Sequence, residues 1–328
     1  MVELGYKLSC EEHPPDHLVR FAGQAEDAGF SFALISDHFH PWTGKHGQSP
    51  FVWTVIGAIA ATTTTLRLGT GVTCPTFRYH PAIIAQAAAT AALMMPGRFF
   101  LGVGSGENLN EHIIGERWPE TEVRLRMLDE AVSIVRLLWT GENHSFHGDF
   151  YTVVNARLYT VPTDEISVMV ASAGPKSAAL AGRIGDGFVG TAPDRRTIQT
   201  FEANGGEGKP KYGEVTVCWA EEEEQARRTA FEWWPTAALP AELGQELPTP
   251  FYYEQAVKLV TEDEVARHVV CGPDPLKHLD ALREFERAGY THICVHQVGP
   301  DQAGFMRFYQ EEILPVFDVA TTATPGPG

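Results

Sequence analysis

The amino-acid sequence predicts an α/β fold, a (β/α)8 TIM barrel that occupies residues 1–320 as a single domain. Three observations predict this fold class. Eight short apolar segments rich in β-branched residues alternate with amphipathic or alanine-rich segments, which is typical of a parallel sheet covered by helices. The 328 residues are enough for a barrel of about 250 residues with insertions. The glycine-rich fingerprint of the runner-up fold, a doubly wound open sheet, does not open the first helix.

The first half of the chain contains four strand–helix units. The predicted strands are 4–9, 32–36, 66–73 and 99–104. The predicted helices are 15–28, 51–61, 81–95, 108–114 and 120–139. Right-handed crossovers between parallel strands then place each strand beside the next.

The second half continues the same order. The predicted strands are 167–172, 187–192, 214–220 and 291–298. The predicted helices are 176–184, a short one near Arg195, 222–234 and 302–314. The nearest candidate for a dinucleotide loop, GVGSGEN (102–108), follows the fourth strand and lacks the required spacing. The barrel is therefore favoured over the open sheet.

Two insertions are predicted, one after strand 4 over residues 141–163 and one after the seventh helix over residues 236–263. In the first, FHGDFYTVVNARLYTVP (146–162) alternates like a β-hairpin. The second is rich in proline and aromatic residues, and long insertions of this kind are usually lids or oligomer contacts. The tail TTATPGPG (321–328) is expected to be disordered.

The composition is that of an acidic globular enzyme, 44% hydrophobic and 20% charged, with a formal net charge of -17. No basic cluster stands out against this charge, so neither nucleic acid nor an anionic membrane is an expected partner. Five separated cysteines without C-x-x-C spacing suit reduced thiols and argue against a zinc site, so no metal is expected. A polar N-terminus and the lack of a long apolar run predict a cytoplasmic protein.

The segment ALISDHFHPW (33–42) places Asp37, His38 and Trp42 where the second strand ends. Active sites of barrels lie at the carboxyl ends of the strands. Other strand ends supply further polar side chains: Glu11, Glu107 and Asn110. Each residue alone has a structural alternative, since Asp37 could cap a turn, His38 could be a core histidine, and a carboxylate such as Glu107 is favoured at any helix N-terminus. Their combination at one mouth indicates a reaction site.

Glycine-rich loops follow three of the strands. They read GTGVT (69–73), GVGSGEN (102–108) and SAGP (172–175). Glycine allows the backbone to approach a ligand closely, and the helix N-termini that follow offer N–H groups to an anion. Three such loops at one face indicate a large planar cofactor that carries phosphate.

Four segments resemble the luciferase-like superfamily: SDHFHPW (36–42), LGTGVTCPTFRYHPAIIAQAAAT (68–90), FFLGVGSGENLNEHIIGERWP (99–119) and AGRIGDGFVG (181–190). More narrowly, the chain is similar to the coenzyme F420-dependent branch, the glucose-6-phosphate dehydrogenase family. The similarity extends over nearly the whole chain. D-H-F-x-P-W after the second strand and G-S/T-G-E-x-L-N-E after the fourth occur together at the spacing of that family.

The resemblance implies that a deazaflavin, coenzyme F420, lies across the barrel mouth. By family position Asp37 would hold the cofactor, and Gly71-Val72 would form a bulge behind its ring that contains a non-prolyl cis peptide. The remaining implied cofactor contacts are Thr73, Cys74, Glu107, Asn110, Ala173, Gly174 and Thr191.

The chemistry of alcohol oxidation can be argued beside the resemblance. Hydride transfer from an alcohol needs a base for the hydroxyl proton, and imidazole is the usual base near neutral pH, which makes His38 the candidate. Glu107, by family position, would manage the charge that develops on the reduced cofactor, a role that requires a raised pKa. Trp42 would form a wall beside the substrate, and Glu11 would contact substrate hydroxyls.

The chain departs from the sugar-phosphate dehydrogenases of this family, which hold the phosphate with basic residues after strand 6 and in the second insertion. The loop after strand 6 has Asp194 where a lysine is expected, and the insertion offers Gln255 with Lys258 a turn later. Arg195 and Arg196 are the other candidate substrate contacts. A carboxylate in a partly dehydrated pocket repels phosphate. We therefore expect glucose 6-phosphate to be a poor substrate and an uncharged alcohol, sugar-type or carbonyl compound to be preferred.

Two alternative functions remain open at this level: an FMN-dependent luciferase-like monooxygenase on the same barrel, and a flavin-binding protein without catalysis. The motif around His38 together with Glu107 favours hydride transfer over both. The segment PAIIAQAAATAA (81–92) has no charged residue, so it is expected to be buried inside the protomer or against a partner. From it a homodimer with a two-fold interface is predicted.

Overall fold

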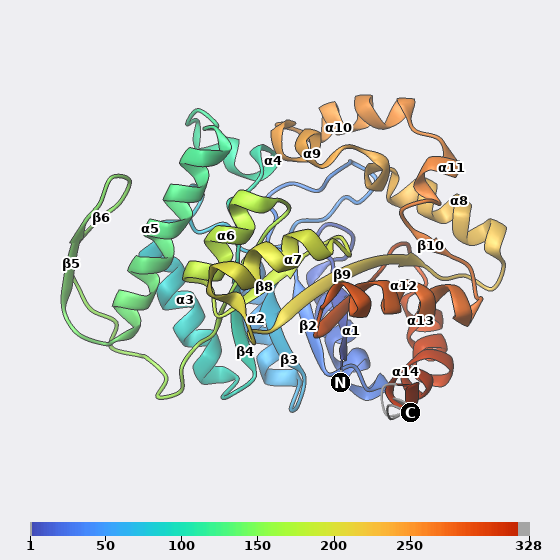
Figure 1. Cartoon of the computed structure of the whole chain (residues 1–328), viewed down its shortest axis with the longest axis horizontal. Helices are drawn as coiled ribbons and strands as arrows, with labels where there is room; N and C mark the ends of the chain where they lie inside the picture. The colour runs from blue at the N-terminus through green and yellow to red at the C-terminus, as the bar shows by residue number, and fades with distance from the viewer. Residues whose placement is uncertain (1, 321–328) are drawn as a thin grey trace.

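Eight parallel strands close into a barrel in the computed structural model, which describes residues 2–320 (Figure 1). In order around the barrel they are β1 (Glu3–Leu8), β2 (Phe32–Ile35), β3 (Arg67–Thr70), β4 (Phe99–Val103), β7 (Val168–Ala171), β8 (Gly187–Gly190), β9 (Lys211–Cys218) and β11 (His292–Gln297). The pairing of β8 with β9 and of β11 with β1 closes the ring. The short strand β10 (Val270–Cys271) extends the sheet beside β9. The predicted (β/α)8 class is confirmed.

Helices cover the outside of the barrel. They are α1 (Pro15–Ala28), α2 (Val52–Thr62), α3 (Pro81–Met94), α4 (Asn108–Glu111), η1 (His112–Ile114), α5 (Thr121–Trp139), α6 (Pro175–Ile184), α7 (Arg195–Phe201), η2 (Glu202–Gly206), α8 (Glu223–Trp233), α12 (Pro275–Ala288), α13 (Gln302–Phe308), η5 (Tyr309–Ile313) and α14 (Leu314–Ala320). Several begin with proline in the first turn, where its missing N–H costs nothing.

Large aromatic rings fill the inside of the barrel. Phe32, Phe100 and Tyr212 belong to one buried cluster. Glycine on the neighbouring strands makes room for them, because a Cβ on Gly69 would lie 2.0 Å from the ring of Phe100, and one on Gly5 would lie 2.4 Å from the ring of Phe32. The lumen is therefore a packed core below the mouth, and the functional side chains stand on top of it.

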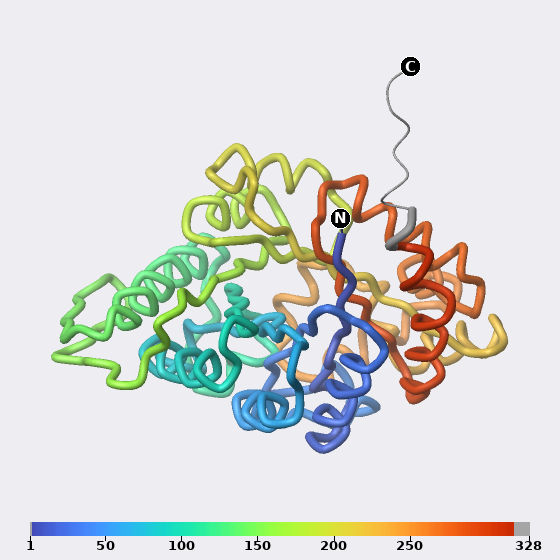
Figure 2. The backbone as a smooth tube through the Cα atoms, turned by 90° about the horizontal axis from the view of Figure 1, so that it is seen from below, coloured from blue at the N-terminus to red at the C-terminus, as the bar shows by residue number. Residues whose placement is uncertain are grey.

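The first insertion is an antiparallel hairpin, β5 (His144–His147) and β6 (Thr152–Ala156), where alternation predicted one. Both views show it extending away from the barrel beside α5 (Figures 1 and 2). The second insertion is helical and contains η3 (Pro235–Ala238), α9 (Ala241–Glu246), α10 (Pro250–Ala256), η4 (Val257–Leu259) and α11 (Glu262–Val265). We call residues 235–265 the lid segment. Its helix α9 packs against α4 at the mouth (Figure 1).

Helix α12 was missed by the sequence analysis. Asp274 caps its N-terminus, Pro275 begins it, and Gly289 ends it with a left-handed conformation, φ 110°. These are ordinary helix boundaries. Between β9 and β11 the chain therefore has α8 before the lid segment and α12 after it, in addition to the short helices of the lid segment itself.

No helix between residues 2 and 320 is long and apolar enough to cross a membrane. The predicted disordered tail, 321–328, lies outside the described residues.

Candidate active site

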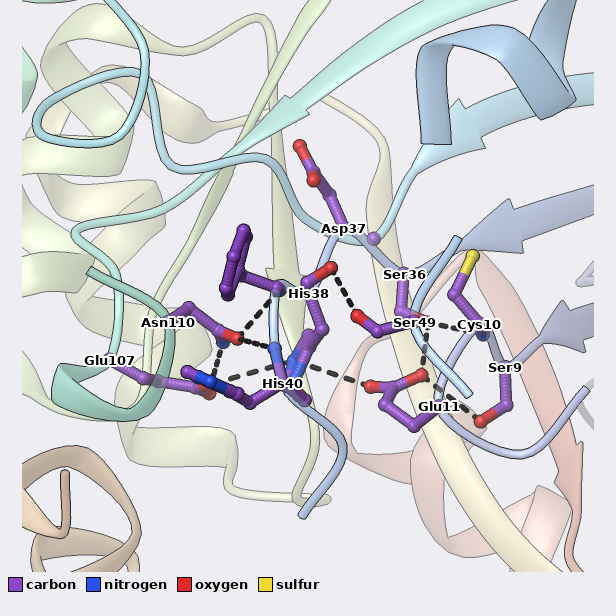
Figure 3. A network of polar contacts seen from close by, with 12 residues as sticks. Ser9, Cys10, Glu11, Ser36, Asp37, His38, His40, Ser49, Glu107 and Asn110 are labelled. Carbon is purple, nitrogen blue, oxygen red and sulfur yellow. Dashed lines mark hydrogen bonds and ion pairs between the residues drawn. The ribbon is translucent and has the colours of Figure 1, made fainter. Parts of the chain in front are cut away.

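His38 stands between two carboxylates at the carboxyl end of the barrel. Its Nε2 atom lies 3.3 Å from Oε1 of Glu11 and 3.5 Å from Oε2 of Glu107. Glu11 follows β1, His38 follows β2, and Glu107 follows β4, so three strand ends converge here (Figure 3). The structure thus brings together the three predicted residues that are separated by up to 96 positions in the chain.

Glu11 is a buried carboxylate held in its ionised form. Its Oε2 atom accepts hydrogen bonds from Oγ of Ser9 at 3.1 Å and Oγ of Ser36 at 2.5 Å. Burial by itself raises the pKa of the Glu11 carboxyl, but His38, Lys7 and the Ser36 hydroxyl together lower it to about 2. Glu11 is therefore a fixed negative charge beside His38 at neutral pH.

Glu107 has the opposite tendency. Burial raises the pKa of its carboxyl and so does the charge of Glu11, while His38 works in the other direction. Its side chain still keeps 30% of its surface exposed, so it remains open to the mouth. Asn110 fixes its orientation by donating Nδ2–H to Oε2 of Glu107 at 3.2 Å, and Oδ1 of Asn110 accepts the backbone N–H groups of Phe39 and His40. The raised pKa that the sequence argument required is present.

The surroundings of His38 define where protons can sit. Its Nδ1 atom lies 3.2 Å from the backbone carbonyl of His40, an acceptor, so Nδ1 carries a hydrogen. Cationic His38 donates from both nitrogens, and its Nε2–H faces the carboxylates. The nitrogen that faces the two carboxylates, Nε2, is therefore the one at which a proton can be gained or lost.

Trp42 and the lid segment cover this cluster. The Trp42 ring lies 4.9 Å from the His38 ring, and the ring of Tyr253 from α10 meets Trp42 edge-on at 5.3 Å. The backbone N–H of Gly44 donates to Glu254 at 2.9 Å, and Asn108 donates to the carbonyl of Glu246 at 2.9 Å. The loops after β2 and β4 are thereby tied to the lid segment.

The Asp37 carboxylate points away from the His38 cluster (Figure 3) and is bound by protein groups. Its Oδ2 atom accepts from Thr73 at 2.8 Å, and Oδ1 accepts from Arg78 at 3.1 Å and from Tyr79 at 3.3 Å. Arg78 also donates to the Asp37 carbonyl and lies 3.5 Å from Glu111. Asp37 is therefore fixed to the loop after β3, next to the predicted cofactor residues.

The predicted bulge after β3 contains a cis Gly71-Val72 peptide bond. From inside the barrel Lys7 donates to the Gly71 carbonyl at 3.0 Å and to Oε2 of Glu214 at 2.7 Å. Burial alone lowers the pKa of the Lys7 ammonium, but Glu214 raises it well above its ordinary value. A second buried pair, His296 and Glu12 at 2.8 Å, lies beside Glu214.

The remaining predicted cofactor residues lie around the same mouth. Cys74 is buried, and its thiol meets the hydroxyl of Thr76 at 2.9 Å. Ala173 and Thr191 are exposed where β7 and β8 end. In front of Gly174 an added Cβ would meet no atom within 4 Å. Among the side chains that the structure describes, those of residues 2–317, no three from His, Cys, Asp or Glu are grouped so that they could hold a metal ion.

The predicted phosphate contacts lie on the surface of the molecule. Arg195 and Arg196 are exposed, and exposed Lys258 donates to exposed Gln255 at 2.8 Å. Asp194 is exposed as well and caps α7, accepting from the backbone N–H of Arg196 and from the Thr197 hydroxyl. The hydroxyl of Thr197 is the main cause of the lowered pKa of Asp194. A partly dehydrated pocket was expected around Asp194, whereas the structure has its side chain exposed at the N-terminus of α7.

Four residues of this region were not singled out from the sequence: Lys7, Arg78, Glu214 and Tyr253. For Lys7 and Glu214 a signal existed, since each is a charged residue inside an apolar strand that should be buried. For Arg78 and Tyr253 the sequence has no comparable signal, because both lie in loops or insertions whose path the chain pattern does not define.

Comparison with known proteins places the chain in a family. The model for the luciferase-like monooxygenase family matches residues 3–292. This chain belongs to the luciferase-like family. The F420-dependent glucose-6-phosphate dehydrogenase of Nocardia farcinica (strain IFM 10152) is 36% identical, over 96% of this chain and 97% of that protein. That of Kribbella flavida is also 36% identical, over 96% and 98%.

A solved structure of an F420-dependent secondary alcohol dehydrogenase in complex with an F420-acetone adduct is similar to this luciferase-like protein. It has a TM-score of 0.88 and 31% identity, over 95% of this chain and 98% of that one. Monooxygenase RslO1 from Streptomyces bottropensis is 22% identical, with a TM-score of 0.73 over 96% of this chain and 99% of that one, a likeness that concerns the fold. The F420-dependent relatives are thus more similar than this monooxygenase.

Proposed function

We propose that this luciferase-like protein is a coenzyme F420-dependent oxidoreductase that moves a hydride between the deazaflavin and an alcohol or carbonyl compound. One observation carries the proposal. His38 contacts two carboxylates whose pKa values are displaced in opposite directions, lowered for Glu11 and raised for Glu107. Such pairs of titratable groups are typical of acid–base sites.

The protein groups supply the proton chemistry. Neutral His38 accepts the hydroxyl proton of the alcohol at Nε2. The resulting imidazolium is stabilised by ionised Glu11 at 3.3 Å, while its Nδ1–H stays bonded to the His40 carbonyl. Glu107, whose raised pKa favours the protonated form, holds or releases a proton at its carboxyl on the open side of the cluster. Trp42 and Tyr253 of the lid segment border the His38 side of the cluster.

The residues around the mouth fit a large planar cofactor. Open space in front of Gly174 and the exposed ends of β7 and β8 leave a surface on which its ring and tail would rest. We propose that the Gly71-Val72 bulge supports the ring, that Asp37, Thr73, Cys74 and Asn110 shape the adjoining wall, and that Ala173, Gly174 and Thr191 contact the tail. When bound, the deazaflavin supplies a two-electron hydride acceptor.

We propose an uncharged substrate in place of glucose 6-phosphate. Asp194 caps the N-terminus of α7 and accepts the backbone N–H of Arg196, so a carboxylate already occupies the position that a phosphate would take there. Being exposed, its carboxylate repels an anion only weakly. Lys258 is paired with Gln255 at the outer surface of the lid segment. The relatives named for glucose 6-phosphate and for a secondary alcohol represent the two substrate classes that the test distinguishes.

The test uses the purified protein with F420 and, separately, FMN. Fluorescence titration should give saturable binding of F420, and the F420-loaded protein should lose the absorbance of the oxidised cofactor with 2-propanol far faster than with glucose 6-phosphate. Replacing Asp194 by Lys should increase use of glucose 6-phosphate. Oxygenation of a substrate with reduced FMN and O2, and no reaction with F420, would instead establish the monooxygenase alternative.

We further propose that the barrel with its insertions is one domain and pairs with a second copy through α2 and α3. Residues 52–66 and 81–95 contain no charged side chain, and Ile83, Leu93 and Met94 are 56%, 41% and 46% exposed on α3. Sedimentation should give a dimer, and a stable 36 kDa species at micromolar concentration would contradict it.

The five cysteines are free, which supports a cytoplasmic location.

A further inference from the structure

Tyr253 is an unusual member of the lid segment. Within the described residues of α9, α10 and η4 it is the one buried side chain, 1% exposed, while its neighbours Phe251 and Tyr252 are 60% and 50% exposed. An exposed insertion that buries a single aromatic ring is anchored through that ring.

The ring is buried against the catalytic cluster. It meets Trp42 edge-on at 5.3 Å, and Trp42 in turn lies 4.9 Å from the His38 ring. Burial raises the pKa of the Tyr253 hydroxyl, and the nearby charge of Glu107 raises it further. Tyr253 is therefore near both the base and the acid of the proposed reaction.

The hydroxyl of Tyr253 is already hydrogen-bonded within the lid segment. It donates to the carbonyl of Gly244, 2.5 Å away in the same lid segment, so it has no hydrogen to offer a substrate. Towards Trp42 the side chain presents its ring. The bond between Glu254 and the N–H of Gly44 holds the neighbouring turn of α10 onto the loop after β2. The ring is thus fixed in place and apolar on the side of the site.

We propose that Tyr253 is a specificity-determining positioning residue: its buried ring holds Trp42 in place, and Trp42 forms the wall that limits the carbon substituents of the substrate. This inference rests on the proposed function and narrows it to compact secondary alcohols and their ketones. A wall of fixed rings accepts alkyl groups and rejects bulky ones by steric overlap. A change of one group in such a pocket alters kcat/KM by about 10–200-fold.

The experiment compares 2-propanol with 1-phenylethanol, using F420-loaded protein. Tyr253→Ala should raise the ratio of kcat/KM for 1-phenylethanol over 2-propanol by at least about 10-fold. Tyr253→Phe, which keeps the ring, should leave the ratio unchanged. Tyr252→Ala is the matched control, because that ring is exposed and one position away. An unchanged ratio in Tyr253→Ala, or an equal change in Tyr252→Ala, would overturn the proposal.

A second readout does not depend on turnover. His38 has 11% of its side chain exposed beneath Trp42 and the lid segment. Diethyl pyrocarbonate modification, followed at His38 by mass spectrometry and referenced to exposed His80, should be several-fold faster in Tyr253→Ala and unchanged in Tyr252→Ala. If the wild-type protein oxidises no alcohol, the proposed function fails, and the modification rates alone test whether Tyr253 holds the cover over His38. An unchanged rate in Tyr253→Ala would disprove that position. Should Tyr253→Ala not fold, Tyr253→Leu takes its place in both assays.

Discussion

Replacing Lys7 by Met should destabilise the barrel strongly. The Lys7 ammonium is 2.7 Å from Glu214, and the two side chains are 8% and 16% exposed. Removing one partner of a buried ion pair leaves the other charge uncompensated and costs about 3–5 kcal/mol. The hydrogen bond from Lys7 to the Gly71 carbonyl is lost as well, about 1 kcal/mol in a typical case.

The assay is urea unfolding followed by tryptophan fluorescence, with the shift of the midpoint at constant slope as the measure of stability. Two variants complete it. Lys7→Met combined with Glu214→Leu removes both charges and should recover much of the loss, because neither member of this pair is left without its partner. Lys176→Met removes a lysine paired with Glu122 at the surface, 69% and 72% exposed, and should leave the midpoint where it is.

Lys7→Met should also weaken binding of F420, because Lys7 holds the Gly71 carbonyl in the bulge on which the cofactor ring is proposed to rest. Fluorescence titration of the folded variant measures this. The reasoning is refuted if Lys7→Met unfolds at the same urea concentration as Lys176→Met, since the pair would then contribute no more than a surface contact.

Three further outcomes are expected. His38→Ala should lower turnover by roughly 10²–10⁴-fold with F420 affinity retained, and near-native turnover would remove His38 from the mechanism. The pKa of Glu11 is lowered to about 2 in the folded protein, so its contribution to stability is complete above about pH 4.5 and is lost as the pH falls towards 2. The difference in unfolding free energy between wild type and Glu11→Gln should therefore shrink over that pH range. A constant difference would contradict the assignment. Gly106→Ala should cost about 1–3 kcal/mol, because φ is 81° there and the new Cβ would lie 2.5 Å from Sγ of Cys74, whereas Gly23→Ala in α1, with nothing within 4 Å, should stabilise slightly.

The order of strands and helices could be predicted from the sequence because it depends on short-range pattern. Apolar β-branched runs and helical spacing are local properties, and the rule that barrel sites lie at the carboxyl ends of strands then converts order into position. That rule was sufficient to select Glu11, His38 and Glu107, which meet within 3.5 Å. Local pattern also contained the boundaries of α12, which the sequence analysis overlooked.

The tertiary structure alone decided the partners of the buried charges and the position of the lid segment. Lys7 and Glu214 are 207 positions apart, and their pairing depends on closure of the ring between β8 and β9 and between β11 and β1. Tyr253 reaches Trp42 only because α9 and α10 fold back over the mouth. Such contacts are set by the packing of whole elements, for which neighbouring residues in the chain contain no signal. The pKa displacements of Glu11 and Glu107 follow from that packing, so the composition of the site was determined by the sequence and its proton chemistry by the fold.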